Sequence, residues 1–359
     1  MFYSLENWQS VNLIQFLLVA QCLLFGLFLV SQKRVFGLAG LLFVIACHMF
    51  FNIMEEVGAL ANFPIITHAF GFLYGPFLWL FVQEMCFSDF KFKSNQLIHI
   101  APFIAALPLP YVTPTLSGVL GPAVVFSMIF YFYKSFYQLA RYHQVLVQTQ
   151  SGATEYRLDW LNYFLGLMVL VSVIDFTRHL FGFTGQSTIA GYFYAVVLIF
   201  ILVSVTFLLI KALKQPDIFV GIQHEDEELL LSNKAPEAHS VSESDQLAYR
   251  RIHEFIAENK SYLDPRLSIS QLAKQIKLPA REVSRLVNLC SERNFSDFVN
   301  HFRVKHACKA MQVSVDDKRK LLDVLLSSGF SSKSSFNALF KKEMKMTPSQ
   351  YRLKIQSHK

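Results

Sequence analysis

The sequence has few charged residues for its length. Asp, Glu, Lys and Arg make up 16% of its 359 residues, whereas hydrophobic residues make up 53%. Soluble domains carry about 25% charged residues, so much of this chain is too apolar to be an ordinary soluble protein. A lipid bilayer is the solvent that accepts long apolar segments. We therefore expect a membrane region.

Patterns typical of metal sites, disulfide frameworks and enzymes are also missing. The five cysteines form no CxxC pair and show no metal-ligand spacing, so they are expected to pack as free, small hydrophobic side chains. HExxH, GxSxG, P-loop and protein-kinase motifs are absent from the sequence. The sequence therefore gives no indication of an enzyme, a metal site or a cofactor.

Charge is unevenly distributed along the chain. Residues 246–359 contain 22 Lys and Arg against 10 Asp and Glu, a net charge of +12, whereas residues 215–245 contain 1 against 8, a net charge of −7. Residues 1–214 are nearly neutral, with 10 against 8. A basic domain is the electrostatic pattern of a nucleic-acid binder. We expect a membrane domain over 1–214, an acidic flexible linker over 215–245 and a DNA-binding domain over 246–359.

Seven apolar segments approach the length of about 20 residues that a membrane-spanning helix needs. They cover residues 11–31, 35–51, 64–87, 97–111, 116–137, 158–181 and 189–213. The fourth is the weakest because three prolines interrupt it. The polar stretch after the fifth suits a loop, although its first part can continue the preceding helix. The expected fold is all-α: a polytopic bundle of seven spans followed by a helical cytoplasmic domain.

The positive-inside rule gives these spans an orientation, because Lys and Arg near helix ends are retained on the cytoplasmic side. With the N-terminus outside, only Arg178 falls on the outer side. The basic residues at inner loops and inner helix ends are Lys33, Arg34, Lys91, Lys93, Lys134, Arg141, Arg157, Lys211 and Lys214. The seventh span then delivers the C-terminal domain into the cytoplasm, where DNA is accessible.

Two polar clusters lie within the apolar segments, where polar groups cost free energy and often mark functional sites. They follow helical spacing toward the outer ends of the second and sixth segments. Their members are His48, Asn52 and Glu55, and Asp175, Arg178 and His179. Facing each other across a bundle, they form a candidate sensor site for a small molecule or an ion. The alternative is that Asp175 only pairs with Arg178 and that Glu55 and Glu56 are solvated loop charges.

Residues 321–352 predict two short helices around a tight turn. The first must end at Gly329, the residue type best able to adopt the left-handed backbone of a helix stop. Ser332 is a natural N-cap for the second, because its hydroxyl can accept a bond from a first-turn amide. Phe336 and Phe340 recur at i and i+4 and predict a face packed on the first helix. This is the pattern of a helix-turn-helix, whose second helix can enter the major groove.

The stretch GFSSKSSFNALFKKEMKMTPSQYR resembles the C-terminal signature of the arabinose-operon regulator (AraC/XylS) family. The matching residues are Gly329, Phe330, Ser332, Phe336, Phe340, Lys341, Lys342, Thr347, Pro348, Tyr351 and Arg352. The resemblance covers about residues 268–352 and implies two helix-turn-helix units on a linker helix, docked in successive major-groove faces on one side of DNA. It implies a bacterial transcription regulator, here in the inner membrane, with promoter DNA, RNA polymerase and a second copy of the chain as expected partners.

A first helix-turn-helix is predicted upstream, with Leu278-Pro279 at its turn. Its exposed face is expected to contact bases, because Arg can form two hydrogen bonds to guanine. In the second unit the outward face is small and polar, and the lysines suit phosphate contacts. The expected base-contacting residues are Arg281, Ser284, Arg285, Asn288, Ser334 and Asn337, and the expected phosphate-contacting residues are Ser332, Lys333, Lys341 and Lys342.

The sequence departs from the family pattern at several positions. Lys277, Glu292 and Lys345 stand where that family usually has Gly, which should cost local stability. Leu325 replaces a usually small residue, and Ala338 replaces a frequent polar reader. The second unit is therefore expected to fix the position on DNA more than to read bases.

A GP element at Gly75-Pro76 and the HxxPF run from His99 look like the seven-helix sensor region that some bacterial regulators carry before AraC-type domains. The expected function is a membrane-anchored, one-component transcription regulator that responds to a small-molecule or membrane signal. One alternative is a membrane transporter or enzyme with a fused DNA-binding reporter domain, and another is a regulator whose membrane part only anchors it. The acidic run 225–228 could also cover the DNA-binding surface until a signal moves it.

Overall fold

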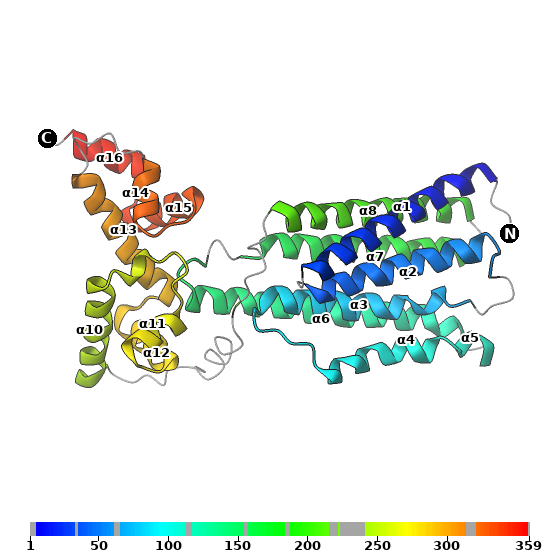
Figure 1. Cartoon of the computed structure of the whole chain (residues 1–359), viewed down its shortest axis with the longest axis horizontal. Helices are drawn as coiled ribbons and strands as arrows, with labels where there is room; N and C mark the ends of the chain where they lie inside the picture. Colours follow the sequence, from blue (N-terminus) through cyan, green and yellow to red (C-terminus); the bar gives the residue numbers. More distant parts are fainter. Residues whose placement is uncertain are drawn as a thin grey trace. The chain divides into compact units, whose positions relative to one another are not determined.

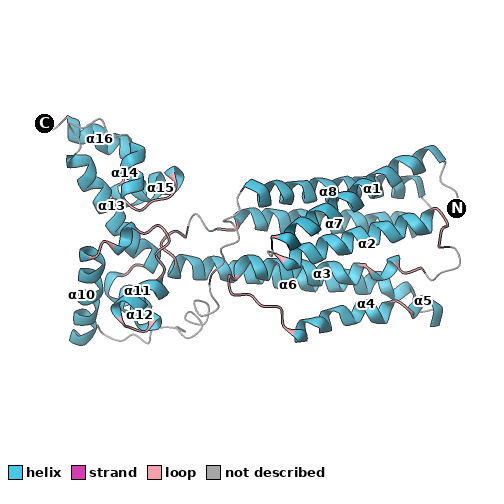
Figure 2. Ribbon diagram, viewed as in Figure 1, coloured by secondary structure: helices cyan, strands magenta, loops and turns pink. Residues whose placement is uncertain are grey.

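Every regular element in the described part of the chain is a helix (Figure 2). The structure is a computed structural model that describes residues 5–32, 35–60, 65–112, 117–153, 157–183, 187–214, 222, 241–313 and 321–357. The all-α class expected from the sequence is confirmed. The chain forms two compact units: Met1–Ala140 with Leu158–Gly221, and Arg141–Arg157 with Ile222–Lys359. The acidic run 225–228 lies outside the described residues.

The first unit is a bundle of long helices whose successive segments alternate in direction (Figure 1). Its elements are α1 (Leu5–Ser31), α2 (Phe36–Glu56), η1 (Thr67–Ala69), α3 (Gly71–Cys86), η2 (Ser94–Ile100), α4 (Ala101–Ala106), α5 (Leu109–Val112), α6 (Ser117–Thr149), α7 (Asp159–Phe183) and α8 (Ser187–Lys214). Because direction alternates, the end of α2, the start of α3, the start of α6, the end of α7 and the start of α8 meet at one end of the bundle.

Five helices among the described residues are long and apolar enough to cross a membrane: α1, α2, α6, α7 and α8. The third predicted span is the shorter α3, whose 16 residues extend about 24 Å. The fourth is not one helix but η2, α4 and α5 in succession. Three prolines in this stretch lack the amide hydrogen that a continuous helix requires. Seven full-length membrane helices are therefore not confirmed.

Small residues let α3 approach its neighbours closely, as the spacing of Gly71 and Gly75 predicts. A Cβ atom at Gly71 would lie 2.6 Å from a methyl carbon of Val124, and one at Gly75 would lie 2.6 Å from the ring of Tyr131. Both neighbours belong to α6. The two glycines of α3 therefore fit it directly against α6.

The second unit consists of two helical halves joined by one long helix. Its helices are α10 (Glu243–Glu258), α11 (Ile269–Ile276), α12 (Ala280–Ser291), α13 (Phe295–Val313), α14 (Leu321–Ser327), α15 (Lys333–Met344) and α16 (Pro348–Gln356), with η5 (Ser261–Leu263) after α10. One apolar core gathers α10, α11, α12 and the first part of α13, and a second gathers the rest of α13 with α14, α15 and α16. The predicted long helix between the halves is α13.

The turns of both helix pairs have the predicted local chemistry. Gly329 has φ +80°, and the Ser332 hydroxyl caps α15 by accepting a 3.1 Å bond from the Ser335 amide. Lys277, Glu292 and Lys345 follow α11, α12 and α15 and have φ values of 56°, 52° and 58°. These three positions adopt the left-handed backbone that favours glycine. A residue with a Cβ atom is strained in this conformation.

The end of α6 belongs to the second unit. The helix continues to Thr149, as the sequence allowed, and a turn then follows whose residues 151–153 are buried. Gln150 forms an antiparallel bridge with Ser268, and the Ser151 amide donates a 3.1 Å bond to the Leu267 carbonyl. The helix that begins in the first unit thus ends within the second unit.

Candidate nucleic-acid interface and membrane cavity

Helix α12 exposes two of the four residues predicted to contact bases in the first helix pair. Arg281 and Asn288 are exposed. Ser284 is only 5% accessible, so the expectation that it lies on the outward face is wrong. Val283 and Val287 are also buried, and α10 packs against α12, which makes the buried face of α12 wide enough to include this small side chain. Ser284 is thus unable to reach a base from this conformation.

Arg285 is partly exposed and is held by two carboxylates. Its guanidinium lies 2.6 Å from Asp245 and 2.7 Å from Glu282. Asp245 belongs to the first turn of α10, where it also completes the capping box with Ser242. The hydrogen bond from Arg285 lowers the pKa of Asp245 to about 2, and Glu282 and Asp245 together raise the pKa of Arg285. One of the two arginines predicted to read bases is therefore already paired within the protein.

Helix α15 presents Lys333, Ser334, Asn337 and Lys341 on its exposed side. These are the residues predicted to face DNA from the second helix pair. Ser332 is half-buried, since its hydroxyl is used to cap the helix. The exposed side of α15 thus combines small polar groups with two lysines, which suits a nucleic-acid backbone.

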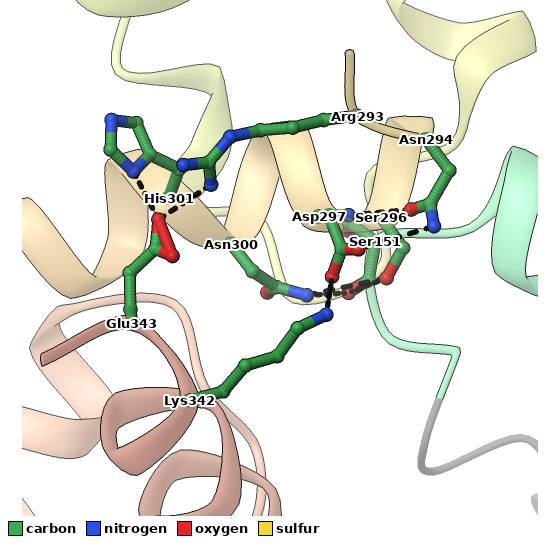
Figure 3. Close-up of polar contacts among 9 residues, drawn as sticks. All are labelled: Ser151, Arg293, Asn294, Ser296, Asp297, Asn300, His301, Lys342 and Glu343. Atoms are coloured by element: carbon green, nitrogen blue, oxygen red, sulfur yellow. Dashed lines mark hydrogen bonds and ion pairs between the residues drawn. The ribbon is translucent and has the colours of Figure 1, made fainter. Parts of the chain in front are cut away.

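Ion pairs fasten α15 to the long helix α13 (Figure 3). The Lys342 ammonium lies 2.7 Å from Asp297, although 61% of its side chain stays exposed. Glu343 pairs with Arg293 at 2.5 Å and also contacts His301. Burial alone would raise the pKa of Glu343, but the hydrogen bonds from Arg293 and His301 lower it. The contacts fix the exposed face of α15 relative to α13.

The most completely buried charged side chain in the C-terminal unit is Arg303 of α13, which is 2% accessible. Its guanidinium donates to the Tyr262 and Asp264 carbonyls, each at 2.7 Å. It also donates to the Ser151 hydroxyl at 2.8 Å and to the Ser151 carbonyl at 3.2 Å. The same carbonyl accepts a 3.2 Å bond from Asn300 (Figure 3). The turn after α6 therefore supplies two of the acceptors that this buried cation requires.

Within the first unit, helices α2, α3, α6, α7 and α8 line a partly open cavity of about 1580 Å³. Five of the six predicted sensor residues line it: His48, Asn52, Asp175, Arg178 and His179. Asp175 and Arg178 form an ion pair at 2.8 Å, so the pairing that the sequence also allowed is present at the cavity wall.

Two tyrosines that the sequence did not indicate contact the predicted sensor residues. The Tyr194 hydroxyl accepts a 2.7 Å bond from Asn52, and the Arg178 guanidinium stacks 5.1 Å from the Tyr194 ring centre. His48 is hydrogen-bonded to the hydroxyl of Tyr74. Neither tyrosine shares a helix with the residue it contacts, so helical spacing could not reveal them.

Glu55 has a different position from the other predicted sensor residues. Its carboxylate accepts bonds from the Ile66 amide at 3.1 Å and the Thr67 hydroxyl at 2.6 Å. It therefore holds the start of η1 and does not contribute to the cavity lining, whereas its neighbour Glu56 does. Glu55 fixes the connection between α2 and α3.

Comparison with known proteins defines the class of the C-terminal unit. A helix-turn-helix domain family matches residues 272–354, which run from within α11 to within α16 and include α12, α13, α14 and α15. The unit is therefore a helix-turn-helix, DNA-binding domain.

The melibiose operon regulatory protein of Escherichia coli strain K12 is 31% identical over 127 residues, which cover 35% of this chain and 40% of that protein. The same protein from E. coli O6:H1 gives the same identity and coverage. This chain thus aligns with less than half the length of these curated relatives. No solved structure matches it significantly. These similarities confirm the resemblance to AraC/XylS regulators: the C-terminal domain is of the AraC type.

Proposed function

We propose that the chain is a membrane-anchored, one-component transcription regulator that binds promoter DNA in response to a signal sensed by its membrane domain. The observation that carries this proposal is an AraC-type helix-turn-helix domain that follows five membrane-length helices in one chain. Diffusible regulators do not need such helices. RNA polymerase and a second copy of the chain are the further partners that we expect at a promoter.

Both helix pairs act as helix-turn-helix units in this proposal. Arg281, Arg285 and Asn288 of α12 read bases, and the polar face of α15 adds Ser334 and Asn337. Lys333, Lys341 and Lys342 bind phosphates, with Ser332 at the start of the same helix. Because Ser284 is buried, it supports α12 and does not contact DNA.

We assign seven membrane crossings, with the N-terminus outside and the C-terminal domain in the cytoplasm. Five crossings use the membrane-length helices, α3 makes one, and the broken segment of η2, α4 and α5 makes another. The alternating direction of these segments supports the number of crossings (Figure 1). The basic loop after α3, which contains Lys91 and Lys93, supports the orientation. Alkaline phosphatase fused after α3 should be inactive and the same enzyme fused after α7 should be active; the reverse pattern contradicts this orientation.

The signal reaches the DNA-binding domain through α6. This one helix lines the membrane cavity with Met128 and Phe132 and ends at the turn that holds Arg303. A rotation or shift of α6 would move Ser151 against the helix that joins both helix pairs. This proposal requires the buried network around Arg303 to switch between two arrangements, because such a two-state element is the physical basis for coupling.

The DNA-binding proposal is tested with the full-length protein in lipid nanodiscs. Its affinity for promoter fragments from its own genomic neighbourhood should fall with salt, and the three α15 lysines alone predict a logarithmic slope of about −3. Arg281→Ala should also weaken the preference for one fragment over another by about tenfold. A flat salt dependence, or a fragment preference that Arg281→Ala leaves unchanged, argues against the interface.

Coupling through α6 is tested at Gln144, an exposed residue in the part of α6 that belongs to the C-terminal unit. Gln144→Pro should interrupt the helix, whereas Gln144→Ala keeps it. In a promoter reporter, Tyr194→Phe in the cavity should alter expression in the wild-type and Gln144→Ala backgrounds. It should have no effect beside Gln144→Pro. An equal effect of Tyr194→Phe in all three backgrounds would exclude this route.

A further inference from the structure

The membrane cavity is long as well as large. Its lining runs on α8 from Thr188 to Leu208 and on α2 from Leu38 to Glu56. At 1.5 Å per residue, these stretches correspond to about 30 Å and 27 Å. The cavity thus extends over about the thickness of the hydrocarbon core of a bilayer. Its volume of about 1580 Å³ exceeds the range of roughly 300 to 1,000 Å³ typical of drug-sized ligands.

The chemistry of the wall changes along this length. The hydrogen-bonding groups gather at one end, where α2 and α7 end and α8 begins: Asn52, Asp175, Arg178 and Tyr194. Toward the other end, the α8 contribution is Leu198, Ile201, Val205 and Leu208 around a single polar residue, Ser204. The Ser204 hydroxyl is buried and has no hydrogen-bond partner among the described residues. The wall is therefore polar at one end and apolar over most of its length.

The polar end contains one ion pair and one further carboxylate, that of Glu56, which accepts a 3.1 Å hydrogen bond from Asn52. Arg178 and Asp175 neutralise each other at 2.8 Å, and the Arg178 guanidinium also stacks on Tyr194. The neighbouring Asn52 and Tyr194 offer a neutral amide and a neutral hydroxyl. An anionic head group would be repelled by Glu56, and a head group with a charge of either sign would have to compete with the ion pair. An uncharged head with hydroxyl groups can join the existing hydrogen bonds.

We propose that the cavity binds a long-chain amphiphile with an uncharged, hydrogen-bonding head, and that amphiphiles of this class are the signal that the regulator senses. The inference rests on the proposed function for its regulatory meaning, but the binding itself does not. The chain of the ligand lies along α8 between α2, α3, α6 and α7, and its head contacts Asn52 and Tyr194. Such a ligand enters from the bilayer, so the protein reports on membrane composition.

Direct binding of a radiolabelled long-chain monoacylglycerol to the full-length protein in phosphatidylcholine nanodiscs tests the proposal. We expect saturable binding of about one molecule per chain, competition by unlabelled long-chain monoacylglycerol, and little competition by a short-chain monoacylglycerol or a long-chain fatty acid. Equal competition by the short chain would overturn the role of the apolar wall. Preference for the fatty acid would overturn the assignment of the head.

Two neighbouring residues of α8 provide a matched pair of variants. Ala195 lines the cavity, whereas Val196 is 40% accessible and lies outside the lining. Ala195→Phe should reduce binding at least tenfold, and Val196→Phe should leave it within about twofold of the wild type. Asn52→Leu should weaken binding about fivefold through the loss of a hydrogen bond to the head. Equal effects of both phenylalanine variants, or bilayer phospholipid as the sole bound molecule in native mass spectrometry, would overturn the site.

Promoter binding measured in the same nanodiscs separates this inference from the proposed function. Intact, Arg281-dependent DNA binding without monoacylglycerol binding would refute the ligand class and leave the regulator in place. Monoacylglycerol binding without any DNA binding would refute the regulator and leave the membrane site.

Discussion

Replacing a strained, left-handed residue with glycine should stabilise the DNA-binding unit. Lys277 follows α11 with φ 56° and is exposed, so its side chain contributes little packing. A left-handed backbone costs a residue with a Cβ about 1 to 2 kcal/mol, and glycine loses about 0.5 to 1 kcal/mol more backbone entropy on folding. Lys277→Gly should therefore increase the free energy of unfolding by about 0.5 to 1 kcal/mol.

A lysine-to-glycine substitution one turn earlier provides a control, because it should lower the free energy of unfolding. Lys274 is exposed within α11, where glycine costs about 1 kcal/mol relative to a good helix former. Glu292→Gly and Lys345→Gly, at the equivalent positions after α12 and α15, should each stabilise like Lys277→Gly. The three sites follow different helices, so the triple variant should gain roughly 2 kcal/mol.

Pulse proteolysis in urea, applied to the full-length protein in nanodiscs, measures unfolding of the C-terminal unit. With a urea dependence of about 1.5 kcal/mol per molar, Lys277→Gly should raise the unfolding midpoint by about 0.3 to 0.7 M, and Lys274→Gly should lower it by a similar amount. A midpoint that falls in both variants would refute the explanation by backbone strain.

Three further predictions concern the same unit. Gly329→Ala should destabilise it by more than 2 kcal/mol, because φ is +80° and the new Cβ would lie 2.6 Å from the Tyr262 carbonyl; an unchanged urea midpoint would contradict this. Asp245→Asn should remove one of the two carboxylates that hold Arg285, although Glu282 keeps its contacts with the guanidinium. DNA affinity measured by fluorescence anisotropy should rise several-fold, and equal or weaker binding would contradict this. The folded-state pKa of Asp245 is lowered to about 2. The ion pair of Asp245 with Arg285 therefore stabilises the fold at pH values above the ordinary pKa of Asp, and this stabilisation is lost as pH falls toward 2. The difference in urea midpoint between the wild type and Asp245→Asn should shrink below about pH 4. Lys333→Ala and Lys341→Ala should each reduce the salt slope of DNA binding by about 1, without changing which fragment is preferred.

Local signals in the sequence were sufficient to predict most helix ends and turns of the C-terminal unit. Gly329 and Ser332 mark a helix end and a helix start through their own backbone and side-chain chemistry, and both act as predicted. The departures from glycine at Lys277, Glu292 and Lys345 were also informative, because the backbone keeps its left-handed conformation at all three. These features depend on nearest neighbours along the chain, which the sequence displays.

Features that depend on packing partners were harder to predict. Ser284 occupies a helical position that would be outward on an isolated helix pair, but α10 also packs against α12, and Ser284 is buried. The insertion of Ser151 beside Arg303 joins residues 152 positions apart and has no local pattern. Tyr194 likewise contacts the polar cluster from α8. The first charged residue of α8 is Lys211, which is far from Tyr194 in the sequence.

The helical bundle of the first unit was predicted in part. Hydropathy locates five helices that are long enough to span a bilayer, and the prolines near Pro102 correctly marked the weakest segment. Hydropathy alone could not show that this segment divides into η2, α4 and α5, because helix breaks depend on backbone hydrogen bonds as well as apolarity.

Mapping the DNA occupancy of the full-length protein and of its Arg281→Ala variant across the genome of the source organism tests the central claim most directly. A membrane-anchored regulator should be found at a small number of discrete promoter sites that share a sequence motif, and Arg281→Ala should lose these sites while remaining in the membrane fraction. The account is contradicted if the wild-type protein shows no discrete sites, or if the Arg281→Ala protein occupies the same sites to the same extent.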